Sequence, residues 1–124
     1  MTARSLRTVY NLATMPMEVI TPQFSKQTLA GEKQMVVWAN LTKGGHAARH
    51  SHKEEQTFWV TSGRMELRIE QDVFDCPQGS VITVPSFVEH EATALEDTTF
   101  ISFLSGVRVD LLDTTVPKHF ESVK

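Results

Sequence analysis

The apolar residues of this chain recur with a period of two, which is the spacing of a β-strand with one buried face. Between Met65 and Glu70 the alternation is strict, with Met65, Leu67 and Ile69 on one side and charged residues on the other. Further short runs are rich in β-branched and aromatic residues: Gln34–Leu41, Thr57–Thr61, Val81–Val84, Thr98–Leu104 and Val107–Leu112. Turn-forming residues separate these runs, and no segment has the stripe of a long helix. Many short strands at close spacing predict an all-β antiparallel sandwich or barrel.

The length of 124 residues is enough for one hydrophobic core and too short for two. We expect residues 1–30 to form an N-terminal arm or edge strand, residues 31–112 a barrel and residues 113–124 a C-terminal tail. An exposed arm on a small β domain often pairs with a second subunit and covers an open sheet edge. We therefore expect a homodimer.

The charge balance is 12 basic against 15 acidic residues, a net charge of −3. No basic field is present to hold a phosphate backbone, which argues against a nucleic-acid partner. The single cysteine, Cys76, cannot form an internal disulfide. No apolar run is long enough for a signal peptide or a membrane span. We therefore expect a soluble, cytoplasmic domain that binds a small molecule, with no membrane partner.

The histidines are the residues that carry chemistry. His50 and His52 are two apart, so on a strand their imidazoles project from the same face and can share one metal ion. Gln56 has the same parity. His90 follows the Val81–Val84 run, and we expect it to face the first pair across the interior of a small barrel. Three imidazoles and one amide oxygen would form a mononuclear metal site.

The residues alone leave a simpler interpretation open. A His-x-His pair is common on polar surface loops, and we expect His46 and His119 to be surface residues. His90 could equally be a polar residue at a strand end. Nickel, manganese, iron and zinc all suit imidazole ligands with one amide, so the metal is not specified.

The spacing of these residues forms two motifs. The first runs from Gly44 through five residues to His50, one to His52, three to Gln56 and six to Gly63. The second runs from Gly79 through five residues to Pro85 and four to His90. Together they resemble the two motifs of the cupin superfamily, which implies a double-stranded β-helix, or jelly-roll barrel, with a metal held by His50, His52, Gln56 and His90.

Several positions depart from that pattern. Gln56 stands where the first motif usually has glutamate, and Phe87 and Ala94 replace a glycine and an asparagine of the second. Glu54 is a rival to Gln56, because it would face inward on a regular strand. The cupin pattern favours Gln56, and strands often bulge beside active sites.

Within the cupins, the stretch from His50 to Gln56 and the stretch Ala94–Glu96 look like those of the pectin-degradation type. That resemblance implies conversion of 4,5-unsaturated uronates into open-chain keto sugars, with Arg108 binding a substrate carboxylate through its guanidinium fork. Ser102 stands where the type has an aspartate for proton transfer, and a serine cannot act as a carboxylate base at neutral pH. Glu54, Glu89 or a metal-bound hydroxide could replace that base.

Four neutral ligands would leave a divalent ion its full double charge. This favours a metal-dependent enzyme that acts on a small carbohydrate, keto acid or uronic acid by non-redox Lewis-acid catalysis, as in isomerisation or ring-opening tautomerisation. A mononuclear-metal dioxygenase is the second hypothesis. A non-catalytic small-molecule-binding cupin is the third.

Overall fold

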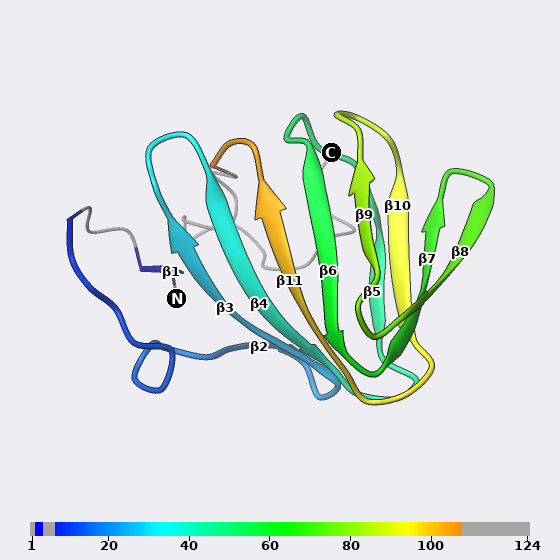
Figure 1. The fold of residues 1–124 in the computed structure, drawn as a ribbon, viewed down its shortest axis with the longest axis horizontal. Helices are drawn as coiled ribbons and strands as arrows, with labels where there is room; N and C mark the ends of the chain where they lie inside the picture. Colours follow the sequence, from blue (N-terminus) through cyan, green and yellow to red (C-terminus); the bar gives the residue numbers. More distant parts are fainter. Residues whose placement is uncertain (1, 4–6, 108–124) are drawn as a thin grey trace.

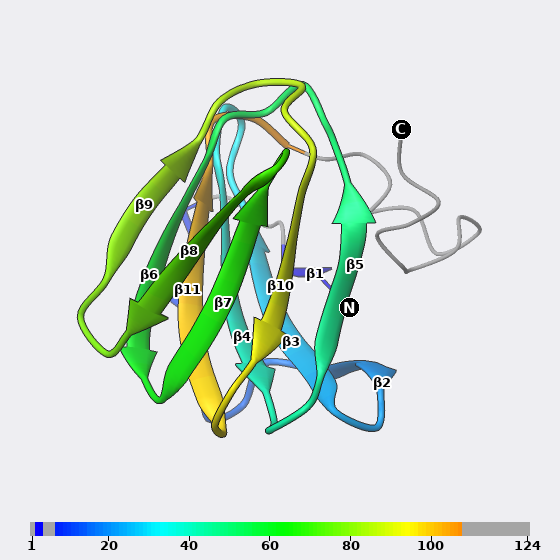
Figure 2. The ribbon, with the colours of Figure 1, turned by 90° about the vertical axis from the view of Figure 1, so that its right-hand side faces the viewer.

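The described residues of the computed structural model, 2–3 and 7–107, form two β-sheets that pack face to face (Figure 1). The seven-stranded sheet has the order β1-β3-β4-β11-β6-β9, with β2 also paired to β3, and the four-stranded sheet has the order β5-β10-β7-β8. The strands of the larger sheet are β1 (Thr2–Ala3), β2 (Glu18–Thr21), β3 (Phe24–Ala30), β4 (Met35–Leu41), β6 (Gln56–Ser62), β9 (Val81–Val84) and β11 (Thr98–Leu104). Those of the smaller sheet are β5 (His46–His50), β7 (Arg64–Ile69), β8 (Asp72–Pro77) and β10 (His90–Ala94). Figure 2 shows the smaller sheet in front of the larger one.

This arrangement confirms the predicted all-β jelly-roll architecture. The predicted strands Val81–Val84 and Thr98–Leu104 are β9 and β11, and Met65–Glu70 corresponds to β7 within one residue at each end. The expected strand over residues 107–112 lies outside the described residues except for Val107, as does the expected tail over residues 113–124. Within the described residues, no helix is present that could cross a membrane.

Alternation along the strands supplies the core. In β4, β6 and β11 every second residue is buried between the sheets, as the sequence pattern requires. The main buried cluster includes Leu41, Val60, Met65, Leu67 and Phe100. Met65 lies opposite Ala94 at the far end of β10, four residues along the strand from His90. The apolar cluster therefore reaches from the cavity beside His50 and His90, which Leu67 and Phe100 help to line, to the far end of β10.

Tight turns close the strand connections at two of the motif glycines. Gly63, between β6 and β7, has φ +83°, and Gly79, between β8 and β9, has φ +91°. Both values lie in the left-handed region, which favours glycine. The glycines of the two motifs thus mark turns, while His50 and His90 lie at strand ends and His52 in a loop.

Candidate metal centre

His50 and His90 are direct neighbours on paired strands. His50 ends β5, His90 begins β10, and the two are partners in the antiparallel register. The expectation that His90 faces the first pair across the barrel is therefore wrong for His50. The two imidazoles come from the same wall, with ring centroids 4.4 Å apart. Cross-strand pairing is what brings together two motifs that are far apart in sequence.

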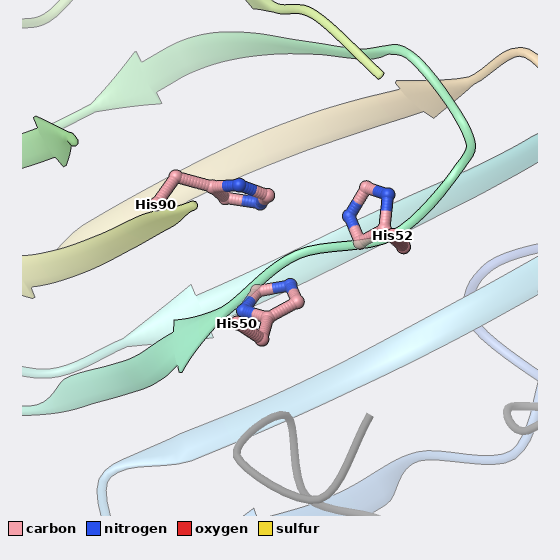
Figure 3. A group of neighbouring side chains, drawn as sticks. All are labelled: His50, His52 and His90. Carbon is pink, nitrogen blue, oxygen red and sulfur yellow. The ribbon is translucent and has the colours of Figure 1, made fainter. Parts of the chain in front are cut away.

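His52 reaches the same place from a loop. It lies beyond the end of β5, and its ring centroid is 5.2 Å from that of His50 and 5.1 Å from that of His90. The backbone N–H of Phe87 donates a hydrogen bond of 2.7 Å to the carbonyl oxygen of His52, which ties this loop to the loop before β10. Figure 3 shows the three imidazoles turned towards a common space.

The Nδ1 atom of each of these histidines forms a hydrogen bond with a main-chain carbonyl oxygen. The distances are 2.9 Å from His50 to Ala48, 2.8 Å from His52 to Glu54 and 2.9 Å from His90 to Val88. A carbonyl oxygen only accepts, so Nδ1 carries a proton in all three rings; in the neutral imidazole, Nε2 then carries the lone pair. This is the arrangement that orients imidazoles as metal ligands.

One nitrogen from each ring lies within 4.8 Å of the other two, and all three side chains are buried. Neutral imidazoles with aligned lone pairs are ligands for divalent transition metals. The three-histidine group could therefore hold a metal ion, as the spacing predicted.

Gln56 approaches the histidines from the opposite sheet. It begins β6, and its Oε1 lies 2.9 Å from Nε2 of His52. Its Nε2 donates a hydrogen bond of 3.0 Å to Oγ of Ser102 on β11, which turns the amide oxygen towards the histidines. Two acceptor atoms then face each other, an arrangement that a shared cation would stabilise.

Glu54 lies on the other side of His52. Its carboxylate is buried, with Oε1 3.7 Å from Nδ1 of His52, whereas Gln56 contacts Nε2. The Glu54 side chain packs close to the chain at Gly106, where an added β-carbon would lie 3.1 Å from Cγ of Glu54 and 3.7 Å from its Oε2. Glu54 is thus close to the histidine group, but on the face of His52 that points away from Gln56.

The remaining predicted site residues are placed as follows. Glu89 is on the outside, where Arg49 donates hydrogen bonds of 3.1 and 3.3 Å to its carboxylate. His46 is also exposed, with Nδ1 2.8 Å from Oγ1 of Thr93, so the prediction of a surface histidine is confirmed. Arg108 and His119 lie outside the described residues.

A small cavity adjoins the histidines inside the barrel, with a volume of about 30 Å³. Its polar lining includes His50, His90, Gln56 and Ser102, and its apolar lining includes Phe58, whose ring centroid is 6.0 Å from that of His90. This volume holds only a few water-sized atoms. Sequence reasoning missed that Ser102 contacts Gln56; the parity of β11 is the signal that could have found it, because Ser102 pairs with Phe58 in the register of an inward-facing row.

Known proteins agree with this fold. A family model described as a cupin domain matches residues 37–105. An RmlC-like cupin from Shewanella frigidimarina NCIMB 400 is similar at a TM-score of 0.79 and 22% identity, over 86% of this chain and 96% of that one. KdgF from Halomonas sp. is similar at a TM-score of 0.78 and 22% identity, over 84% of this chain and 99% of that one.

A salicylate 1,2-dioxygenase mutant from Pseudoaminobacter salicylatoxidans is similar at a TM-score of 0.66 and 15% identity. That alignment covers 71% of this chain but only 28% of the dioxygenase. No curated protein sequence matches the chain. These structural similarities are below 25% identity and establish the fold, whereas the family model covers more than half of the sequence. The chain therefore belongs to the cupin domain family.

Proposed function

We propose that this cupin is a metal-dependent enzyme that acts on a small polar substrate, a carbohydrate or a keto or uronic acid, by non-redox Lewis-acid catalysis. Isomerisation and ring-opening tautomerisation are the reactions that fit. The observation that carries the proposal is the neutral donor set: three histidines with Nδ1 held by carbonyl oxygens, and the amide oxygen of Gln56 beside them. A divalent ion held there keeps its full charge and supplies a Lewis acid for a carbonyl, enol or carboxylate oxygen.

The residues around the donor set have separate tasks in this proposal. His50, His52 and His90 hold the ion, and Gln56 presents its oxygen because Ser102 holds the other end of the amide. Glu54 acts as a positioning residue, since its carboxylate lies near Nδ1 of His52 and not on the side of Gln56. A carboxylate close to a ligand histidine raises the basicity of the ring.

The cavity beside the histidines supports a polar substrate. Its polar lining of His50, His90, Gln56 and Ser102 suits a polar group of the substrate. The resemblance to uronate-degrading cupins assigns Arg108 to a substrate carboxylate. Ser102 can pass on a proton but cannot act as a carboxylate base, so this chain differs from that type in its proton transfer.

Metal binding is tested first, with His90→Ala and the matched control His46→Ala. His90 belongs to the histidine group, whereas His46 is exposed and bonded to Thr93. Loss of a ligand should weaken binding of Ni²⁺, Mn²⁺, Fe²⁺ or Zn²⁺ by more than about 100-fold, since loss of an outer partner alone costs 10–100-fold. Calorimetric titration of metal-free protein measures this. Equal affinities of the two variants would refute the site.

The reaction is tested with a 4,5-unsaturated galacturonate, followed by its ultraviolet absorbance while dissolved oxygen is recorded. We expect substrate loss without oxygen uptake in the metal-loaded protein. The structural similarity to a salicylate dioxygenase supports the second hypothesis, and oxygen consumption in step with turnover of an aromatic or keto-acid substrate would establish it instead. Tight substrate binding without turnover under any metal would favour the non-catalytic binder.

A further inference from the structure

Phe87 has a backbone conformation that favours glycine. It lies in the loop between β9 and β10, and its φ is +65°. The N–H of Val88 donates a hydrogen bond of 3.3 Å to the carbonyl oxygen of Pro85, which closes a four-residue turn with Phe87 in the third position. A positive φ at that position is typical of a type II turn, which normally has glycine or asparagine there. A bulky residue in the left-handed region is strained, so phenylalanine lowers the stability of this turn relative to glycine.

Burial of the side chain does not offset this strain. Phe87 is 72% exposed, the largest exposed fraction of any aromatic residue in the part of the chain that the structure describes. The next residue, Val88, packs instead against the main apolar cluster. An aromatic ring left in water gains none of the stabilisation that burial supplies. A residue that is both strained and exposed is therefore better explained by function than by folding.

The turn that carries Phe87 is tied to two of the three clustered histidines. Its backbone N–H donates the 2.7 Å hydrogen bond to the carbonyl oxygen of His52, and the carbonyl oxygen of Val88 accepts from Nδ1 of His90 at 2.9 Å. Phe87 therefore lies beside the backbone that positions His52. Figure 2 shows the β5–β6 and β9–β10 loops together at the upper end of the barrel.

The opposite side of the histidines is filled. The apolar cluster runs from Leu67 and Phe100, which line the cavity, to Met65 and Ala94 at the far end of β10. The loop end of the barrel is thus the side from which a substrate can approach an ion on the histidines. Phe87 is an exposed aromatic residue at that end.

We propose that Phe87 is a substrate-contacting residue, whose exposed ring is a platform for the ring of a carbohydrate or uronic acid while a polar group of that substrate reaches the histidines. The inference rests on the proposed function, because it names a contact for that substrate. The face of a phenyl ring is electron-rich and attracts the polarised C–H groups of a sugar ring. Aromatic side chains that line a site in this way fix the orientation of a ligand together with a few polar groups. Glycine would suit the turn better but would leave no such surface.

Three variants separate the ring of Phe87 from its backbone conformation. Phe87→Tyr keeps both the ring and the strain, Phe87→Ala keeps only the strain, and Phe87→Gly removes both. In thermal unfolding of the metal-free protein, Phe87→Gly should therefore melt a few degrees above the wild type, and Phe87→Ala close to it.

Substrate binding is measured on the metal-loaded protein by calorimetric titration with galacturonate, which lacks the 4,5 double bond. Phe87→Ala and Phe87→Gly should bind it about 10-fold more weakly than the wild type, within the range that stacking on an aromatic side chain contributes, and Phe87→Tyr should match the wild type. The KM for a 4,5-unsaturated galacturonate should rise by a similar factor, with kcat little changed. The metal affinity of all three variants should equal that of the wild type, because the backbone N–H to His52 is retained.

Val73→Ala is the matched control. It removes an apolar side chain that is 48% exposed on β8, in the outer face of the smaller sheet, so its galacturonate affinity should be unchanged. A Phe87→Gly variant that melts below the wild type would overturn the inference, because the ring would then stabilise the fold.

The wild type separates this inference from the proposed function. Equal galacturonate affinity and equal KM in wild type and Phe87→Ala would overturn the platform and leave the proposed function in place. Binding without turnover that is weakened in Phe87→Ala would support the platform and contradict the enzyme. A wild type that neither binds galacturonate nor converts the unsaturated form would overturn both.

Discussion

A main-chain carbonyl oxygen accepts a hydrogen bond from Nδ1 of each of the three clustered histidines. For His50 and His90 the acceptor is the residue two positions earlier, and for His52 it is the residue two positions later. The backbone itself therefore selects the tautomer at each ring. Because these bonds form with folding, the lone pairs of Nε2 are oriented before any ion binds, and the ordering cost of binding is lower.

The hydroxyl of Ser102 accepts a hydrogen bond from the amide of Gln56, which a carboxylate in place of Gln56 could not donate. Ser102→Ala should weaken metal binding by about 10-fold, because the Nε2 group of Gln56 loses its buried acceptor and its amide is no longer held with Oε1 towards His52. Competition titration with a metal-binding dye measures the affinity.

The control for that prediction is Ser62→Ala. Ser62 also makes a hydroxyl hydrogen bond, to Thr99 at 2.6 Å, but at the other end of β6 from Gln56. Its metal affinity should equal that of the wild type. An unchanged affinity in Ser102→Ala would show that Gln56 is oriented by something other than this serine.

Among the elements, the strands that the sequence predicted are those with β-branched and aromatic residues, such as β9 and β11. The strands β5 and β10, which carry the histidines, were not predicted. Their sequences, HAARH and HEATA, are rich in alanine and charged residues and have low intrinsic β propensity. They are strands because they pair with each other and with β7, and their small alanines pack inside the barrel.

The clustering of the three histidines could therefore be predicted from motif spacing, while the strands from which they come could not. Spacing identifies His50, His52, Gln56 and His90, but it does not say which strands pair. Gln56, not His90, comes from the opposite sheet. Register is set by the whole sheet, and local pattern does not determine it.

Two of the turns between strands differ in how well they tolerate replacement of their glycine. Gly63→Ala should destabilise the fold by roughly 3 kcal/mol or more, because its φ is +83° and a β-carbon there would collide with the carbonyl oxygen of Asp97. Gly79 also has a positive φ, but the β-carbon added by Gly79→Ala would meet nothing within 4 Å. Its cost should be only about 1–2 kcal/mol. Urea unfolding measures both, and equal losses would contradict the steric explanation.

The β7–β8 hairpin carries an ion pair whose effect on stability depends on pH. Hydrogen bonds of 2.7 and 2.6 Å from the Arg64 guanidinium lower the pKa of the Asp75 carboxyl, and the opposite charge adds to the effect. A carboxyl with a lowered folded-state pKa contributes stability above its unfolded pKa and loses it as the pH falls through the folded one. That window begins at about pH 4 and extends below it.

Asp75→Asn should therefore be less stable than the wild type at pH 7, and the difference should vanish at low pH. The effect is small because both side chains are about half exposed, and it should shrink further in about 1 M salt. Urea unfolding of both proteins across the pH range checks it. A difference that grows as the pH falls would contradict the assignment.

At the scale of the whole molecule, the candidate metal site lies at one end of the main apolar cluster, which continues away from it along the barrel. β5 ends and β10 begins at the upper end of Figure 2, and His50 and His90 are the residues at these two strand ends. Met65 and Ala94 pair four residues further along β10, which is about 13 Å away. Removal of an ion should therefore leave the core intact.

We expect a strong chelator to lower the melting temperature without unfolding the protein. At a metal concentration about 100 times the dissociation constant, binding stabilises the native state by about 2.7 kcal/mol. For a domain of this length that corresponds to a shift of roughly 10 °C. Thermal unfolding followed by circular dichroism, with and without chelator, measures the shift. The melting temperature of the His90→Ala variant should change neither with added metal nor with chelator. Unfolding at room temperature on chelation would mean that the metal, not the apolar cluster, determines the fold, and an unchanged melting temperature would mean that no ion binds the folded chain.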